Sequence, residues 1–261
     1  MLILLSPTKK IVDGPAVEGL PATQPMMLGQ TEVLMKTTRR LSGPKLQKLM
    51  GISKDLADLT RRRFQQWSTP FTAENARQAA LSFNGDVYRG LDAGSMSTED
   101  LGFAQDHVAI LSGLYGVLRP LDLMQPYRLE MGAPLSTRRG RNLYAFWGQR
   151  ITDCLNELTE GHGDRTIVNL ASGEYFKSVR PEKLAGPLVT PVFKELKDGR
   201  ARVLSFFAKP ARGMMARWAV EQRVTTAEEL RSFDVGGYVL RPELSDETRW
   251  EFERPQPPPK T

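Results

Sequence analysis

The sequence predicts a single mixed α and β domain built on one central mixed sheet, and three observations support this prediction. Apolar runs of strand length lie near both ends of the chain. Between them, apolar residues recur at helical spacing behind N-cap residues. Of the 261 residues, 40% are hydrophobic and 25% are charged, which is enough apolar chain for a sizeable core. We therefore expect residues 1–254 to form one domain, with strands from both ends sharing a sheet.

The first expected element is a short buried strand over residues 2–5, Leu-Ile-Leu-Leu. It ends at Ser6-Pro7, because proline has no N–H to donate to a central ladder. Residues 13–28 contain three prolines and little periodicity, so we expect a loop there.

Helices follow this loop, each preceded by an N-cap residue. Four such residues stand before stretches with apolar spacing of three and four: Ser42, Ser53, Thr72 and Thr98. Within the second stretch, four apolar residues fall on one predicted buried face: Leu56, Leu59, Phe64 and Trp67. The three arginines at 61–63 are expected near its rim.

Beyond Gly140 the pattern alternates between helix and strand. The expected elements are a helix over 144–158, a strand over 166–171, an Asp198-Gly199 hairpin joining 189–196 to 201–208, a helix from Pro210 to Gln222, and strands over 237–241 and 249–254. Proline suits a first helical position, where its missing N–H has no helical acceptor. Residues 255–261 are proline-rich, and we expect a disordered tail there.

The composition excludes several classes of protein. The single Cys154 excludes a disulfide framework and a cysteine cluster for a metal, and it fits a reducing compartment. The opening apolar run is too short for a signal peptide, and the chain is too polar for a membrane span. His107 and His162 lie far apart in the sequence. We therefore expect a cytosolic protein, in the cytoplasm, that binds no membrane, no metal and no cofactor.

The formal charge of +6 is distributed unevenly along the chain. Residues 36–63 hold nine basic and two acidic side chains, and residues 194–223 hold eight basic and three acidic ones. Two acidic stretches, 72–107 and 225–254, compensate. Such asymmetry is typical of a protein that meets a polyanion on one face, although solvated basic helices would give the same pattern.

Four polar clusters stand at the ends of expected elements. The first is Ser6-Pro7-Thr8-Lys9-Lys10, directly after the first strand, where strand ends commonly present side chains to ligands. The fourth surrounds the start of the helix expected at Pro210, where three cations and helix amides would converge on a phosphate: Lys209, Arg212 and Arg217. A capped loop and solvated arginines are the alternatives.

The second cluster runs through 111–122 and 126–132. Gly113 and Gly116 predict a tight turn whose exposed amides could bind phosphate oxygens, with Arg119 and Arg128 nearby. A helix C-cap at Gly113 would explain that glycine without a ligand.

The third cluster follows the strand expected at 166–171. Asn169, Ser172 and Glu174 would lie at one sheet edge beside free helix amides, which is a natural pocket for an anion or a polar ligand. Capping of the next helix alone is the alternative.

Longer strings closely resemble the YaaA peroxide-stress protein family. The matching segments are Leu-Ser-Gly-Leu-Tyr-Gly-Val-Leu-Arg-Pro-Leu-Asp at 111–122, Pro-Tyr-Arg-Leu-Glu-Met-Gly at 126–132, Asn-Leu-Ala-Ser at 169–172, Glu-Tyr-Phe at 174–176, Lys-x-Ala-Arg-Gly at 209–213, the opening seven residues, and Phe-Thr-x-Glu-Asn-Ala-Arg at 71–77. The resemblance spans the chain to about residue 254.

This resemblance implies a bacterial protein that helps cells survive hydrogen peroxide by lowering free intracellular iron, which limits oxidative damage. It also implies a single-domain α/β fold of unusual topology, a positively charged cleft, and DNA binding through a helix-hairpin-helix-like element. The segment beginning at Leu111 departs from the usual hairpin pattern: it has no proline before its first glycine, one extra residue, and Pro120 in the expected second helix.

Two functions compete at this point. The first is binding of duplex DNA through backbone phosphates, with an indirect effect on iron, because one cysteine and two histidines are a poor set for storing or oxidising the metal. The second is an enzyme acting on a base, a nucleotide or a related small anion. Its candidate catalytic residues are Glu174 as general acid or base, with Lys9, Asn169 and Tyr175. A third interpretation makes every cluster purely structural.

Overall fold

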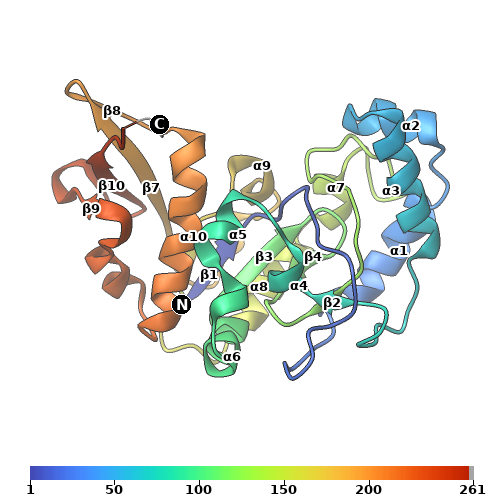
Figure 1. Ribbon diagram of the computed structural model, residues 1–261, viewed down its shortest axis with the longest axis horizontal. Coiled ribbons are helices and arrows are strands. Elements are labelled where there is room, and N and C mark those ends of the chain that lie inside the picture. Colours follow the sequence, from blue (N-terminus) through green and yellow to red (C-terminus); the bar gives the residue numbers. More distant parts are fainter. Residues whose placement is uncertain (259–261) are drawn as a thin grey trace.

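The computed structural model describes residues 1–258, which are organised around an eight-stranded sheet (Figure 1). In spatial order its strands are β4 (Gly116–Leu118), β3 (Val108–Ser112), β1 (Leu2–Leu5), β6 (Ile167–Asn169), β7 (Leu188–Lys197), β10 (Arg249–Pro255) and β9 (Val239–Leu240), with β8 (Arg200–Arg202) paired to β7 alone. Two short strands, β2 (Arg77–Gln78) and β5 (Leu123–Met124), form a separate antiparallel pair.

The middle of the large sheet is parallel and its margins are antiparallel. β1 pairs in parallel with β3 and β6, and the parallel register continues from β6 through β7 to β10. β4, β8 and β9 pair antiparallel with their neighbours. All four residues of β1 are buried, as expected for a parallel strand covered on both faces. The predicted mixed α/β fold, with strands from both ends of the chain in one sheet, is confirmed.

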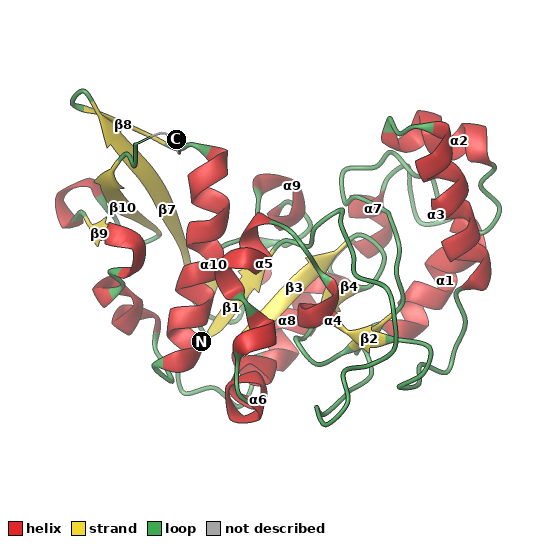
Figure 2. Cartoon of the chain, viewed as in Figure 1, coloured by secondary structure: helices red, strands yellow, loops and turns green. Residues whose placement is uncertain are grey.

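The helices surround this sheet (Figure 2). They are α1 (Leu28–Thr38), α2 (Gly43–Met50), α3 (Lys54–Gln66), α4 (Ala79–Ser82), α5 (Asp86–Leu91), α6 (Thr98–His107), α7 (Leu143–Trp147), α8 (Arg150–Leu158), α9 (Gly173–Phe176) and α10 (Ser205–Glu221). Short 3-10 helices are η1 (Ala93–Ser95), η2 (Pro181–Lys183), η3 (Ala227–Ser232), η4 (Val235–Gly237) and η5 (Pro242–Leu244).

One face of the sheet is covered by α10, which packs on β1, β7 and the helices α5 and α6. Glycines allow α5 and α10 to approach closely. A Cβ on Gly213 would lie 1.9 Å from the carbonyl oxygen of Val87, and one on Gly90 would lie 2.1 Å from that of Pro210. This contact fixes the first turns of α10 against the start of α5, where the candidate site lies.

The helices α1 to α3 form an extension at one side of the sheet (Figure 1). Ser42 and Ser53 occupy the predicted N-cap positions of α2 and α3, and the Ser53 side chain accepts a hydrogen bond from Leu56 N–H. The predicted buried face of α3 is only partly right, since Leu56 is 39% exposed while Ala57, Thr60 and Phe64 are buried. The arginines at 61–63 lie on or near its exposed side.

Two predicted N-caps differ from the structure. The cap of α6 is Ser97, one residue before the predicted Thr98, because the Ser97 and Asp100 side chains form a capping box. Thr72 starts no helix. A turn bonded to the Asn75 side chain follows it and leads into β2.

Three boundaries in the second half also differ. The helix predicted over 144–158 is divided into α7 and α8 at Gly148, whose φ of +57° is left-handed. The hairpin forms, but its second strand is only β8, because α10 begins at Ser205 and contains Pro210 in its interior.

The C-terminal tail is shorter than predicted. Pro255 is the last residue of β10, and Gln256 N–H donates a hydrogen bond to the Leu196 carbonyl oxygen. Pro255 therefore belongs to the sheet, and Gln256 is attached to it by this hydrogen bond. Residues 259–261 of the predicted tail lie outside the described part of the chain.

The segment resembling a helix-hairpin-helix is a β-hairpin instead. β3 and β4 pair antiparallel from Ile110 with Leu118 to Ser112 with Gly116, and every residue from 108 to 118 is buried. Gly113 and Gly116 therefore expose no amides, and the prediction of a phosphate-binding glycine turn there is wrong. A Cβ on Gly113 would lie 2.3 Å from the Leu129 carbonyl oxygen, so dense packing explains this glycine.

Candidate functional site

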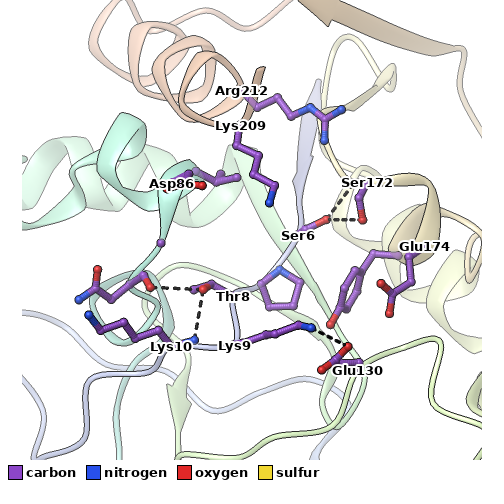
Figure 3. Close-up of a pocket in the computed structure, with 15 residues that line it drawn as sticks. Ser6, Thr8, Lys9, Lys10, Asp86, Glu130, Ser172, Glu174, Lys209 and Arg212 are labelled. Carbon is purple, nitrogen blue, oxygen red and sulfur yellow. Dashed lines mark hydrogen bonds and ion pairs between the residues drawn. The ribbon is translucent and has the colours of Figure 1, made fainter. Parts of the chain in front are cut away.

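A cavity of about 530 Å³ opens at the carboxyl ends of the adjacent parallel strands β1 and β6 (Figure 3). This edge of a parallel sheet is where open α/β folds bind their ligands. The lining residues come from the segments after β1 and β6, the start of α5, the loop before α7, and the first turns of α10: Ser6, Pro7, Thr8, Lys9, Lys10, Asn84, Gly85, Asp86, Val87, Glu130, Ser172, Glu174, Tyr175, Lys209 and Arg212.

Two serines join the strand ends at the cavity wall. Ser172 N–H donates to Ser6 Oγ at 2.8 Å, and the two hydroxyl oxygens are 3.3 Å apart. The Tyr88 hydroxyl donates to the Ser6 carbonyl oxygen at 3.1 Å. These bonds hold the segments after β1 and β6 together and place both serine hydroxyls at the cavity.

The loop after β1 is fixed against the turn that starts α5. Thr8 Oγ1 donates to the Asn84 carbonyl oxygen at 3.3 Å, and Asn84 N–H donates to the Lys10 carbonyl oxygen at 2.9 Å. A Cβ on Gly85 would lie 2.6 Å from Thr8 Oγ1, so glycine is the residue that lets the two segments meet. The backbone carrying Lys9 and Lys10 is therefore held in place.

The cavity is lined by four basic and three acidic side chains. Lys9 Nζ lies 3.1 Å from Glu130 Oε2, and Asp86 pairs with Arg89. Lys209 and Arg212 have no carboxylate within 4.0 Å among residues 1–258. Figure 3 shows Lys209 pointing toward Ser6, whereas Lys10 points away from the centre of the cavity.

Arg212 is half-buried, and this burial lowers the pKa of its guanidinium. Burial has removed water from this guanidinium, and no carboxylate of residues 1–258 has replaced that water. Its N–H groups can therefore form charge-assisted hydrogen bonds with a bound anion. Within the described chain, Arg212 therefore presents a partly desolvated guanidinium without a carboxylate partner at the cavity.

Glu174 and Tyr175 lie on the opposite side, on α9. Glu174 Oε1 accepts a hydrogen bond from Gly132 N–H at 2.9 Å, which ties α9 to the loop before α7. Burial raises the pKa of the Tyr175 hydroxyl above its ordinary value, with the carboxylates of Glu174 and Glu130 acting in the same direction. Tyr175 is therefore a neutral hydroxyl at physiological pH.

A second hollow of about 280 Å³ shares Glu130 and Glu174 with the first and reaches Leu49 and Met50 at the end of α2. We refer to these two adjoining hollows as the cleft; their lining residues extend from Lys209 and Arg212 on α10 to Leu49 and Met50 on α2. In Figure 1, α10 and the β7–β8 hairpin stand on one side of α9, and α2 and α3 stand on the other.

The structure brings together seven of the residues singled out from the sequence. The residues that line the main cavity are Lys9, Lys10, Ser172, Glu174, Tyr175, Lys209 and Arg212. Arg128 lines a small adjoining hollow with Lys9 and Tyr175, and its guanidinium lies 3.4 Å from Glu130 Oε1.

Three other predicted residues lie away from the cavity. Asn169 is 8% exposed, and its side-chain oxygen accepts from Ala171 N–H, so it caps the strand end. Arg119 pairs with buried Asp122 at 3.1 Å. Arg217 pairs with Glu221 at 2.8 Å and with Asp92 at 3.3 Å. Both arginines have carboxylate partners, which a count of charges along the sequence does not identify.

Other cavity residues were not singled out from the sequence. The turn Asn84-Gly85-Asp86 is a recognisable start of a helix, but nothing local connects it to residue 8. Glu130 lies inside a matched string, yet only the fold shows its pairing with Lys9.

The two histidines are neighbours in space despite their separation in sequence. Their rings stack with centroids 4.8 Å apart, and His107 Nδ1 lies 3.0 Å from the Met1 carbonyl oxygen. Burial is the largest cause that lowers the pKa of both rings. Among residues 1–258, no three potential ligand side chains converge in a way that could hold a metal ion.

Comparison with known proteins identifies the family. The family model described as "Peroxide stress protein YaaA" matches residues 1–244. A UPF0246 protein of Saccharophagus degradans is 51% identical over 256 residues, which cover 98% of this chain and 100% of that relative. Within the part of the chain that the structure describes, helices long and apolar enough to cross a membrane are absent. From the extent of both matches, the chain belongs to the YaaA family of peroxide stress proteins.

Proposed function

We propose that this member of the family binds duplex DNA in the cytosol through backbone phosphates and so limits oxidative damage to it. The observation that supports this function is the two cations of the cleft that are unpaired among residues 1–258, Lys209 and Arg212, which line its main cavity. At its other end the cleft reaches Leu49 and Met50 of α2, the helix that also carries the exposed Lys45 and Lys48. Phosphates are the partners that such cations bind most readily, with little dependence on base sequence.

An indirect effect on iron fits the chemistry of the chain. Cys154 is buried in α8, and burial raises the pKa of its thiol to about 12. A thiol with this pKa is protonated at neutral pH, and the protonated form is a poor metal ligand. In this proposal, less iron-dependent damage therefore comes from binding DNA rather than from an iron site on this thiol.

The test is the salt dependence of duplex binding, followed by fluorescence anisotropy of a labelled oligonucleotide. The logarithm of the affinity should fall linearly with the logarithm of salt concentration, with a slope of about −0.9 per phosphate contacted. Lys209→Ala combined with Arg212→Ala should reduce that slope by about 2 and weaken binding to all sequences alike.

Arg231→Ala is the matched control, because Arg231 already pairs with Glu228 at 3.1 Å. Its slope should equal that of the unmodified protein. A slope near zero for the unmodified protein, or no change on removing Lys209 and Arg212, would reject duplex binding through the cleft.

A second candidate function follows from the size and the polar lining of the main cavity. Its volume suits a nucleotide-sized anion, and it combines Arg212 with the hydroxyls of Ser6, Ser172 and Tyr175. Glu174 and Lys9 would then act on a bound base or nucleotide as acid–base groups. Calorimetry with nucleoside monophosphates and triphosphates tests this alternative. Tight binding that Arg212→Ala abolishes, together with weak duplex binding, would favour it over the first proposal.

A further inference from the structure

Phe206, the second residue of α10, is 66% exposed, more than any other large hydrophobic side chain among residues 1–258. Its neighbour Phe207 is half-buried, with the Arg254 guanidinium 5.2 Å from its ring centroid. The Phe206 ring contacts Phe207 edge-on, at a centroid separation of 5.2 Å, and leaves most of its own surface to solvent. A large aromatic ring exposed in this way is typical of a contact surface.

The cations around Phe206 differ from the other basic residues of segment 188–258. Seven basic residues between 188 and 258 pair with carboxylates: Lys194, Arg217, Arg223, Arg231, Arg241, Arg249 and Arg254. The other five have no carboxylate within 4.0 Å in that range or elsewhere in the described chain: Lys197, Arg200, Arg202, Lys209 and Arg212. All five lie on the β7–β8 hairpin or in the first turns of α10, on either side of Phe206 along the chain.

Along the chain, Phe206 lies between residues that line two different hollows. Leu204 lines one of about 530 Å³, together with Lys197, Arg200 and Arg202 on the hairpin. Lys209 lines the main cavity, also of about 530 Å³. Lys209 is the third residue after Phe206 on α10, which corresponds to a rise of about 4.5 Å along the helix axis. A single nucleotide could therefore contact both side chains.

We propose that Phe206 is a stacking platform for an unpaired base of single-stranded DNA, whose backbone passes from the hairpin cations to Lys209 and Arg212. This inference rests on the proposed DNA binding and adds an opened strand as a second form of DNA that the surface around Phe206 would hold. Single-strand sites combine a positive groove with aromatic rings that stack on bases of any sequence. In an intact duplex both faces of each base are already stacked on neighbouring bases. The Phe206 ring can therefore stack on a base only where the two strands are separated.

The charge of the surface favours nucleic acid over an apolar protein partner. Five unpaired cations lie around the ring, and the unpaired acid among the residues lining the hairpin hollow is Asp198 at the turn. Glu195, which also lines that hollow, already pairs with Arg254 at 3.3 Å and accepts from the Tyr238 hydroxyl. A protein partner would have to supply many carboxylates to cover this surface.

The test compares single-stranded and duplex oligonucleotides of the same length on Phe206 variants. Phe206→Ala should weaken single-strand binding by about tenfold, within the range measured for loss of one stacked base, and leave duplex binding unchanged within about twofold. Phe206→Trp should restore single-strand binding, and Phe206→Leu should not. A strand containing 2-aminopurine should show quenched fluorescence on the unmodified protein and on Phe206→Trp only.

Leu244→Ala is the matched control, because Leu244 is also half-exposed, at 51%, but lies on η5. It should bind both forms of DNA as the unmodified protein does. Unchanged single-strand affinity in Phe206→Ala, with duplex binding intact, would overturn the stacking role and leave the proposed function standing. A change in sedimentation of Phe206→Ala without a change in DNA affinity would identify a protein contact instead. Failure of both DNA forms to bind would reject both proposals together.

Discussion

Cys154 is the residue whose environment gives the clearest dependence on pH. Burial raises the pKa of its thiol to about 12 in the folded protein, well above the value of about 8.5 in an unfolded chain. Because the folded pKa is the higher one, only the unfolded chain releases the thiol proton between about pH 8.5 and pH 12. The free energy of unfolding is therefore unaffected by this thiol below about pH 8.5 and falls as pH rises toward 12. The free energy of unfolding, measured by urea denaturation, should fall between pH 8 and pH 10 in both proteins. In the unmodified protein it should fall by about 1–2 kcal/mol more than in Cys154→Ala.

The same thiol should also react slowly with a disulfide reagent in the native state and rapidly in urea, since the reactive thiolate is rare and buried. Equal reaction rates in the native and unfolded states would show that the Cys154 thiol is accessible. Parallel pH profiles of unfolding for the unmodified protein and Cys154→Ala would show that burial does not shift its pKa.

At the scale of single residues, the sequence correctly brought together the side chains in the segments that follow β1 and β6. Lys9, Lys10, Ser172 and Glu174 follow β1 or β6, and these strands are neighbours in a parallel sheet, so the four residues meet. Asn169 follows the same logic but turns inward to cap Ala171. Strand position is readable from local sequence, whereas the direction of one side chain depends on packing.

The contact between α5 and α10 carries a prediction at the scale of elements. Gly213→Ala places a methyl group against the Val87 carbonyl oxygen, which backbone atoms cannot avoid without moving the helices apart. We expect a loss of about 1–3 kcal/mol in the free energy of unfolding, measured by urea denaturation. Since α10 carries Lys209 and Arg212, weaker binding of duplex DNA should accompany this loss.

Gly102→Ala is the control for that substitution. Gly102 lies inside α6, and apart from its chain neighbours and the backbone of its own helix no atom of residues 1–258 lies within 4 Å of the place that an alanine methyl group would take. Alanine should therefore stabilise the protein by about 0.4–1 kcal/mol. A Gly213→Ala protein as stable as Gly102→Ala would mean that α5 and α10 separate easily.

Helices, strands and turns were predicted correctly where the local sequence alone determines the structure. They were predicted wrongly where contacts with distant parts of the chain determine it. Ser53 and the Asp198-Gly199 turn act as their sequences indicate. Pro210 suits a first helical position, but α10 starts five residues earlier. The strings at 111–122 contain helix-compatible residues, yet β3 and β4 form there because this segment adds to the edge of a buried sheet beside β1.

At the scale of the whole molecule, the charge pattern was predicted in part. Counting along the chain located both basic segments. In the fold, Lys209 and Arg212 of the second segment line the main cavity, and Leu49 and Met50 of the first segment line the adjoining hollow. Counting did not separate paired cations from unpaired ones. Arg217 and Arg212 are five residues apart on α10, but only Arg217 has carboxylate neighbours, which come from Asp92 and Glu221. That distinction requires three-dimensional neighbours.

Duplex DNA lying across this cleft should contact both of its sides at once. Lys45→Ala with Lys48→Ala on α2, and Arg200→Ala with Arg202→Ala on the hairpin, should each reduce the salt slope of duplex binding by up to about 2. The two pairs of substitutions are distant and share no partner, so the quadruple variant should show the sum of both reductions. Arg241→Ala, whose cation is held by Glu243 and Glu253, should leave the slope unchanged. If either pair of substitutions has no effect, the duplex lies along one side of the cleft only.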